Sequence, residues 1–233
     1  MKAGPGHPQG LLTIWSTGYA RGFGGAERMV NALIRRRSSQ PQILIADGNP
    51  RQPLPKEYFA PLPANVTLRV DTFPNPLLSS GPVDFAINVG RYVRASARLW
   101  RFFRRNRPAI VHQHFVSLDV FLLALYRQFF DYRLIVTFCG GDLTVAQRSA
   151  AARFKIRMAL RYADAVTAVS AEMAATLRNR FGGRSVSCIP NGVDVAEVRD
   201  AAARVTSRVP DGHFVFVGRL HRDKRVSQMI TLT

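Results

Sequence analysis

The arrangement of apolar runs along the chain limits most strongly what it can fold into. Short runs rich in Val, Ile and Leu recur, and a stretch of helical periodicity follows most of them. The runs do not alternate apolar with polar residues, so both faces of each predicted strand are expected to be buried. A parallel sheet covered by helices on both faces has this property. The sequence therefore predicts an α/β fold, a doubly wound Rossmann-like parallel sheet.

The predicted elements alternate along the chain. We expect strands at residues 11–16, 42–48, 66–70, 109–115, 133–138, 165–170 and 185–190. We expect helices at residues 25–37, 83–106, 117–129 and 146–162, and one that ends at Phe181.

A short helix and a linker are expected in residues 194–212, and a new strand follows them. We predict one domain over residues 1–208 and the first βα unit of a second domain over residues 209–233. A single βα unit cannot bury its own apolar faces. The sequence thus suggests an incomplete second domain, from a truncated gene, a shifted frame or an enzyme split between two chains.

The charge balance favours anionic partners. The chain has 33 basic and 15 acidic residues, a formal charge of +18, and all but four of the basic residues are arginines. Such a balance suits phospholipid surfaces, phosphorylated substrates or nucleic acid. The polar N-terminus has no secretory apolar segment, and no apolar run is long enough to span a bilayer. We expect a cytoplasmic protein, either soluble or peripheral at the inner face of the cell membrane. Cys139 and Cys188 are expected to be reduced thiols.

The predicted helix at residues 83–106 has one basic face. Five of its arginines follow a 3-4-3-4 spacing, which aligns them, while Phe85, Val89, Tyr92, Leu99 and Phe103 are predicted toward the other side. A basic amphipathic helix can rest on an anionic membrane, although a solvated face is the ordinary reading. The predicted membrane-facing residues are Arg91, Arg94, Arg98, Arg101 and Arg105.

Loops that follow the strands are the places for ligands in such a sheet. After the first strand, Gly24 and Gly25 permit close backbone approach, and Glu27 lies in the first turn of the next helix. The spacing is not that of a dinucleotide-binding loop, and a plain tight turn remains an alternative.

Two histidines, His112 and His114, lie two residues apart at a predicted strand end and should share one side of it. No further ligand cluster completes a metal site around them. A catalytic or substrate-binding histidine, or a hydrogen-bonded structural pair, fits better.

Three later loops carry weaker signals. Asp142 follows two glycines and could contact a ligand or cap the next helix. Asn191 and Gly192 form a strong turn signal. Near the end of the chain, Arg219 and Lys224 flank a strand–helix turn, where they could hold a diphosphate or simply be solvated.

The motifs "GGAERMV", "VHQHF", "ADAVTAVSAEM", "IPNGVD" and "FVGRLHRDK" occur in an order that resembles family-4 glycosyltransferases of the GT-B fold. The resemblance runs from about residue 11 to the end of the chain. It implies an N-terminal acceptor-side domain and a C-terminal domain that binds the nucleotide-sugar. It also implies transfer with retention of configuration, and no metal, which agrees with the absence of an Asp-x-Asp motif from the sequence.

By position, the resemblance assigns catalytic roles to His114 near the transferred sugar and to Arg219 and Lys224 beside the leaving diphosphate. It places these residues in donor or acceptor binding: Gly24, Gly25, Glu27, His112, Asp142, Asn191, Gly192 and Gly218.

The resemblance implies a retaining glycosyltransferase that moves a sugar from a donor such as a UDP- or GDP-sugar to a glycan or lipid-linked acceptor. Cell-envelope polysaccharide or glycolipid biosynthesis would use such a reaction. No cofactor is expected, and little activity is expected without a donor domain, which a separately encoded C-terminal half could supply. The alternative is a non-catalytic basic domain that binds membranes or other polyanions. Nucleic-acid binding lacks a recognition motif.

Overall fold

The computed structural model describes most of the chain. The described residues are 12–16, 25–36, 40–47, 62–71, 73–74, 79–116, 119–183 and 185–205, with the single positions 216 and 226. The chain divides into two compact units, residues 1–192 and 193–233. The predicted domain boundary near residue 208 lies outside the described residues and stays a prediction.

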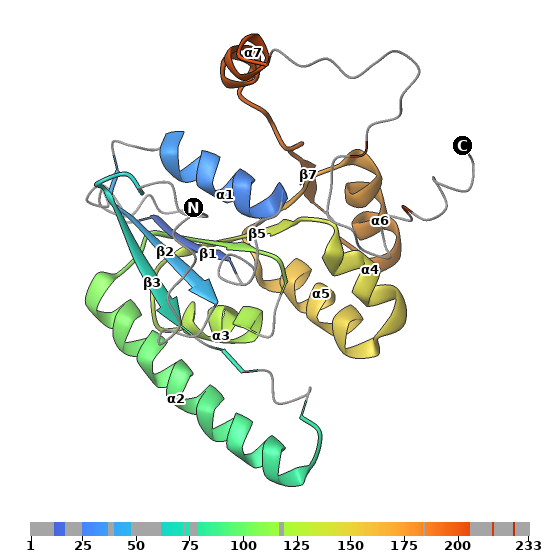
Figure 1. The fold of residues 1–233 in the computed structure, drawn as a ribbon. Helices are drawn as coiled ribbons and strands as arrows, with labels where there is room; N and C mark the ends of the chain where they lie inside the picture. The colour runs from blue at the N-terminus through green and yellow to red at the C-terminus, as the bar shows by residue number, and fades with distance from the viewer. Residues whose placement is uncertain are drawn as a thin grey trace, which may run out of the picture. The chain divides into compact units, whose positions relative to one another are not determined.

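A parallel sheet of seven strands forms the centre of the first unit, in the order β3-β2-β1-β4-β5-β6-β7 (Figure 1). Every neighbouring pair of strands is parallel, and the chain crosses over after β3. The strands are β1 (Leu12–Ser16), β2 (Gln42–Asp47), β3 (Val66–Asp71), β4 (Ile110–His114), β5 (Arg133–Phe138), β6 (Ala165–Ala168) and β7 (Val186–Cys188). The predicted doubly wound α/β fold is confirmed.

The helices of this unit lie where the sequence predicts them, with one exception. They are α1 (Gly25–Arg36), α2 (Pro82–Asn106), α3 (Asp119–Tyr126), α4 (Gly141–Arg148), α5 (Ala150–Tyr162) and α6 (Ala171–Phe181). The helix predicted at residues 146–162 is two helices that meet at Ser149, which has an extended backbone. The Ser149 hydroxyl accepts a hydrogen bond from the Ala152 amide, so this residue caps α5 instead of continuing α4.

Side chains on β2 show how the sheet is covered. Leu44 packs with Val30 and Ile34 of α1 in one buried cluster. Ile43 and Ile45 belong to a larger cluster that contains the buried residues of α2, α3, α5 and α6. Because successive strand residues point to opposite faces, α1 covers one face of β2 and the larger cluster covers the other.

Helix α2 is buried along only part of its length. Leu99 and Phe103, on the side predicted to face away from the arginines, are fully buried. Phe85 and Val89, predicted on the same side, are 47% and 37% exposed. The reason is visible in Figure 1, where the N-terminal half of α2 extends past the sheet that would cover it.

The second unit contains helix α7 (Val195–Ala203), which confirms the short helix predicted near residue 194. Its N-cap is Asp194, whose carboxylate accepts hydrogen bonds from the amides of Ala196 and Glu197 at 3.0 and 3.2 Å. No residue of α7 is buried, so the cap is its main local support.

Candidate functional site

The predicted histidine pair lies at the carboxyl end of β4. Ile110 packs with the α1 cluster and Val111 packs with the larger cluster on the opposite face. By alternation, His112 and His114 share the face that α1 covers. Their rings stack with centroids 4.1 Å apart, which confirms that they share one side of the strand.

A row of hydrogen bonds fixes the first of these histidines. The Nε2 atom of His112 lies 2.7 Å from the Thr137 hydroxyl of β5, and that hydroxyl lies 2.7 Å from the Thr167 hydroxyl of β6. The proton position on His112 decides which group donates in each bond. The row orients the His112 ring, against which the His114 ring is stacked. Neither threonine was predicted from the sequence, although each shares the face of its strand on which the histidines lie.

His114 is completely buried, and neither of its ring nitrogens has a hydrogen-bond partner among the described residues. Burial, and secondarily the neighbouring His112, lower the pKa of His114 well below its ordinary value. The imidazole is therefore neutral near pH 7, with one N–H donor and one nitrogen acceptor unused. A buried polar group without a partner costs free energy, and a hydroxyl-bearing ligand could satisfy it.

The backbone turns sharply directly after His114. Phe115 has a φ of 64°, in the left-handed region that a bulky residue rarely adopts. Its amide donates a hydrogen bond to the Thr137 carbonyl at 3.2 Å, which holds the turn against β5. Strained residues of this kind persist where the surrounding structure fixes them, often beside functional groups.

Other predicted site residues are only partly placed. Gly25 begins α1, and Glu27 lies in its first turn. Gly24 lies outside the described residues. Asp142 lies in the first turn of α4, whose N-cap is Gly140, so the alternative of a capping Asp142 is wrong.

The remaining predicted residues either follow β7 or lie outside the described part of the chain. Asn191 and Gly192 are exposed and lie in irregular backbone after β7. Gly218, Arg219 and Lys224 lie outside the described residues, and their roles stay predictions. Cys139 and Cys188 are not joined by a disulfide bond.

The five arginines of α2 that were predicted to face a membrane lie in a different place. All are exposed, and they form one strip along the helix. Only Arg98 among them forms an ion pair within the described residues, with Asp71 of β3. Because α2 belongs to the larger cluster, these arginines and the histidines are on opposite faces of the sheet.

The fold is similar to that of solved GT-B glycosyltransferases, at low sequence identity. Sucrose-phosphate synthase from Thermosynechococcus elongatus superposes with a TM-score of 0.64 at 17% identity, over 95% of this chain and 59% of that one. HepE of Anabaena in complex with UDP and glucose gives 0.56 at 13% identity, over 83% and 50% of the two chains. Arabidopsis thaliana UGT89C1 complexed with UDP-L-rhamnose gives 0.50 at 12% identity, over 86% and 55%.

The family model described as Glycosyltransferase Family 4 matches residues 23–197. The chain therefore belongs to Glycosyltransferase Family 4. No curated protein matches it in sequence. The chain spans less than two thirds of each of the three solved chains.

Proposed function

We propose that this chain provides the acceptor-side domain of a retaining glycosyltransferase. The enzyme would transfer a sugar from a nucleotide-sugar to a glycan or lipid-linked acceptor, as cell-envelope polysaccharide or glycolipid biosynthesis requires. Family membership supports sugar transfer in general. HepE was solved with UDP and glucose and UGT89C1 with UDP-L-rhamnose, which makes a nucleotide-sugar the natural donor class.

The observation that carries the proposal is the state of His114. A neutral, fully buried imidazole with both nitrogens unpartnered lies at the carboxyl end of β4. Ligands of parallel α/β sheets bind at this edge. Sugar hydroxyls both donate and accept hydrogen bonds, so one hydroxyl group can satisfy either ring nitrogen.

The donor side of the proposal depends on residues outside the described part of the chain. Negative charge grows on the diphosphate as the glycosidic bond breaks, and fixed cations stabilise it. We assign this role to Arg219 and Lys224, with Gly218 permitting close approach of the backbone. No metal is required if these two cations carry the charge.

The test is a transfer assay on the full-length protein with UDP- and GDP-sugars and a lipid-linked acceptor fraction. We expect saturable donor binding, and a loss of transfer of at least about tenfold in His114→Asn, the value of one hydrogen bond. Melting curves of the variant must match wild type. Absence of saturable binding for every common donor would contradict the proposal.

A second candidate, surface binding to anionic membranes, rests on the exposed half of α2. Val83 and Ile87 are 73% and 47% exposed and lie four residues apart, one turn before Arg91 of the arginine strip. Apolar side chains followed by arginines can enter the interface of an anionic bilayer. Among the described residues no helix has the length and apolar character needed to cross a membrane.

Co-sedimentation with anionic vesicles tests this candidate. Val83→Asp together with Ile87→Asp should reduce vesicle binding severalfold, because the carboxylates are repelled by the surface. Equal vesicle binding by wild type and variant would show that Val83 and Ile87 do not contribute to membrane binding.

A further inference from the structure

A groove lies between the edge strand β3 and the C-terminal half of α2, and it is lined almost entirely by cationic and polar side chains. Its volume is about 470 Å³. We call it the arginine groove, defined by its lining residues Arg69, Arg98, Arg101, Phe102, Arg105 and Asn106.

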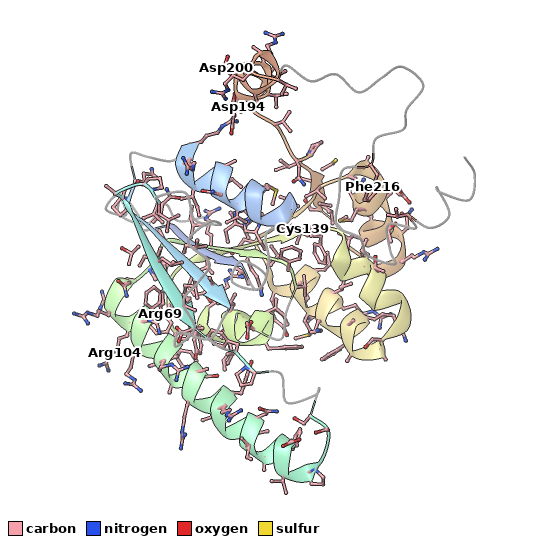
Figure 2. All side chains as sticks on the ribbon, in the orientation of Figure 1. Arg69, Arg104, Cys139, Asp194, Asp200 and Phe216 are labelled. Carbon is pink, nitrogen blue, oxygen red and sulfur yellow. The ribbon has the colours of Figure 1, made fainter. Side chains whose placement is uncertain are left out.

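The arginine groove is separate from the histidine pair. Val66 and Leu68 of β3 pack with the α1 cluster, so by alternation Arg69 lies on the face that α2 covers. Figure 2 shows Arg69 beside α2, with Arg104 farther along the helix surface. His112 and His114 are on the other face. A ligand in the arginine groove therefore cannot contact them.

Asp71 organises two of the arginines. Its carboxylate is 8% exposed and accepts a hydrogen bond from the Nε atom of Arg69 on one oxygen. Its other oxygen lies 3.3 Å from the Nε atom of Arg98. The Arg69 guanidinium also lies over the Phe102 ring, 4.8 Å from the centroid. Both guanidinium groups are held at Nε, and their Nη groups make no hydrogen bond to the described residues.

The other two arginines are not neutralised by any described carboxylate. Arg101 donates from Nε to the carbonyl of Ala97 in its own helix at 3.3 Å, and Arg105 makes no interaction with a described residue. Four guanidinium groups therefore line the groove, and the one carboxylate paired with two of them leaves a local formal charge of +3. Like charges gathered at this density repel one another, and a bound anion removes that cost.

The donors fit a phosphate group better than a simple anion. Guanidinium groups present paired N–H donors that match two oxygens of a phosphate at once. Arg69 and Arg98 are tethered through Nε by one carboxylate, so little side-chain entropy is lost when their Nη groups bind a ligand. An anion with several oxygens can also reach Arg101 and Arg105.

We propose that the arginine groove is a binding site for a phosphate group, distinct from any donor diphosphate site. The group can belong to a soluble phosphorylated ligand or to the headgroup of a lipid. Binding does not depend on sugar transfer, so the site can exist whether or not the proposed function is correct.

The experiment compares two double variants that remove the same charge. Arg101→Gln with Arg105→Gln alters the arginine groove, and Arg104→Gln with Arg157→Gln alters exposed arginines that neither line the groove nor belong to the predicted membrane-facing strip. All four side chains are exposed, so both variants should melt close to wild type. Both are made in a background carrying Arg219→Gln and Lys224→Gln, which removes the cations assigned to the donor side.

Two probes separate the sources of the phosphate: titration with inorganic pyrophosphate, and sedimentation with phosphatidylcholine vesicles with or without phosphatidic acid. We expect the groove variant to weaken binding of at least one probe about tenfold, the loss of one charge-assisted contact. The control variant should stay within about twofold. A groove-dependent effect on pyrophosphate alone indicates a soluble ligand, and one on phosphatidic acid vesicles alone indicates a lipid headgroup.

Two results would overturn the proposal. One is equal weakening by both variants, which would show that binding follows net charge and not the arginine groove. The other is the absence of binding to both probes at low salt, where electrostatic attraction is strongest.

Discussion

The two faces of the sheet differ in how exposed and how charged their polar side chains are. On the α1 face, His114 is completely buried and held neutral, and no residue that the structure describes is hydrogen-bonded to its ring nitrogens. On the α2 face, four arginines remain solvated around a groove, and one carboxylate orients two of them. Burial removes charge from the first site, and exposure preserves charge in the second. Each face is therefore suited to a different ligand chemistry, neutral hydroxyl groups in one case and anionic oxygens in the other.

The cost of the two arrangements also differs. An unpartnered buried imidazole lowers stability, because its lost hydration is not replaced. Exposed arginines cost little individually, and the aromatic side chains beneath them hold α2 in place. Phe103 packs edge-on against Tyr126 and Tyr132 with ring centroids 5.6 and 5.2 Å apart. Stability on the α2 face thus comes from packing below the charges.

The largest expected effect follows from that packing. Phe103→Ala should lower the free energy of unfolding by about 3–5 kcal/mol, because it removes a fully buried ring from the core. Phe85→Ala, on the exposed half of the same helix, should change it by less than about 0.5 kcal/mol. Urea unfolding measures both. A similar cost for the two substitutions would mean that the N-terminal half of α2 is also packed in solution.

A smaller effect of opposite sign is expected on the α1 face. His114→Leu removes an unsatisfied polar group and keeps a side chain of comparable size, so the free energy of unfolding should rise by about 1 kcal/mol. Sugar transfer should be lost in the same variant if His114 contacts the substrate. Marked destabilisation in urea unfolding would instead indicate that the His114 nitrogens are hydrogen-bonded in the folded protein.

The strand pattern of the fold was predictable because both faces of each strand are buried. Unalternated runs such as residues 133–138 can occur in few other architectures, and the doubly wound sheet follows from them. The break at Ser149 was not predictable from periodicity, because the residues on both sides of it are helical and only a local hydrogen bond separates α4 from α5.

The candidate sites were predictable to different degrees. The spacing of His112 and His114 was enough to place them on one side of a strand. Their hydrogen-bonding row needed the register of β4, β5 and β6, which pairs His114 with Thr137 and Thr137 with Thr167. The arginine groove needed the contact between β3 and α2, since Arg69 and Asp71 are far in sequence from the arginines of the helix. The spacing of arginines along the predicted helix could identify only the lining residues that α2 contributes.

The last expected effect is a loss of stability at mildly acidic pH that originates on the α1 face. The pKa of His114 is well below its ordinary value of 6.5 in the folded protein, whereas in the unfolded chain it is expected near that value. At a pH between these two pKa values, His114 is protonated in the unfolded chain but not in the folded protein. The contribution of neutral His114 to the free energy of unfolding is therefore fully present above about pH 6.5. It decreases as the pH falls toward the pKa of the folded state, by at most about 1.4 kcal/mol per pH unit.

The change in unfolding free energy between neutral and mildly acidic pH should be smaller in His114→Leu, because this variant lacks the titrating group. His112 remains in both proteins. The Arg101→Gln, Arg105→Gln variant should keep the wild-type slope, since arginine does not titrate in this range. If His114→Leu leaves the slope unchanged, His114 is already accessible to protons in the folded state. The α1 face would then not differ from the α2 face in excluding charge, because His114 is the residue on which that difference rests.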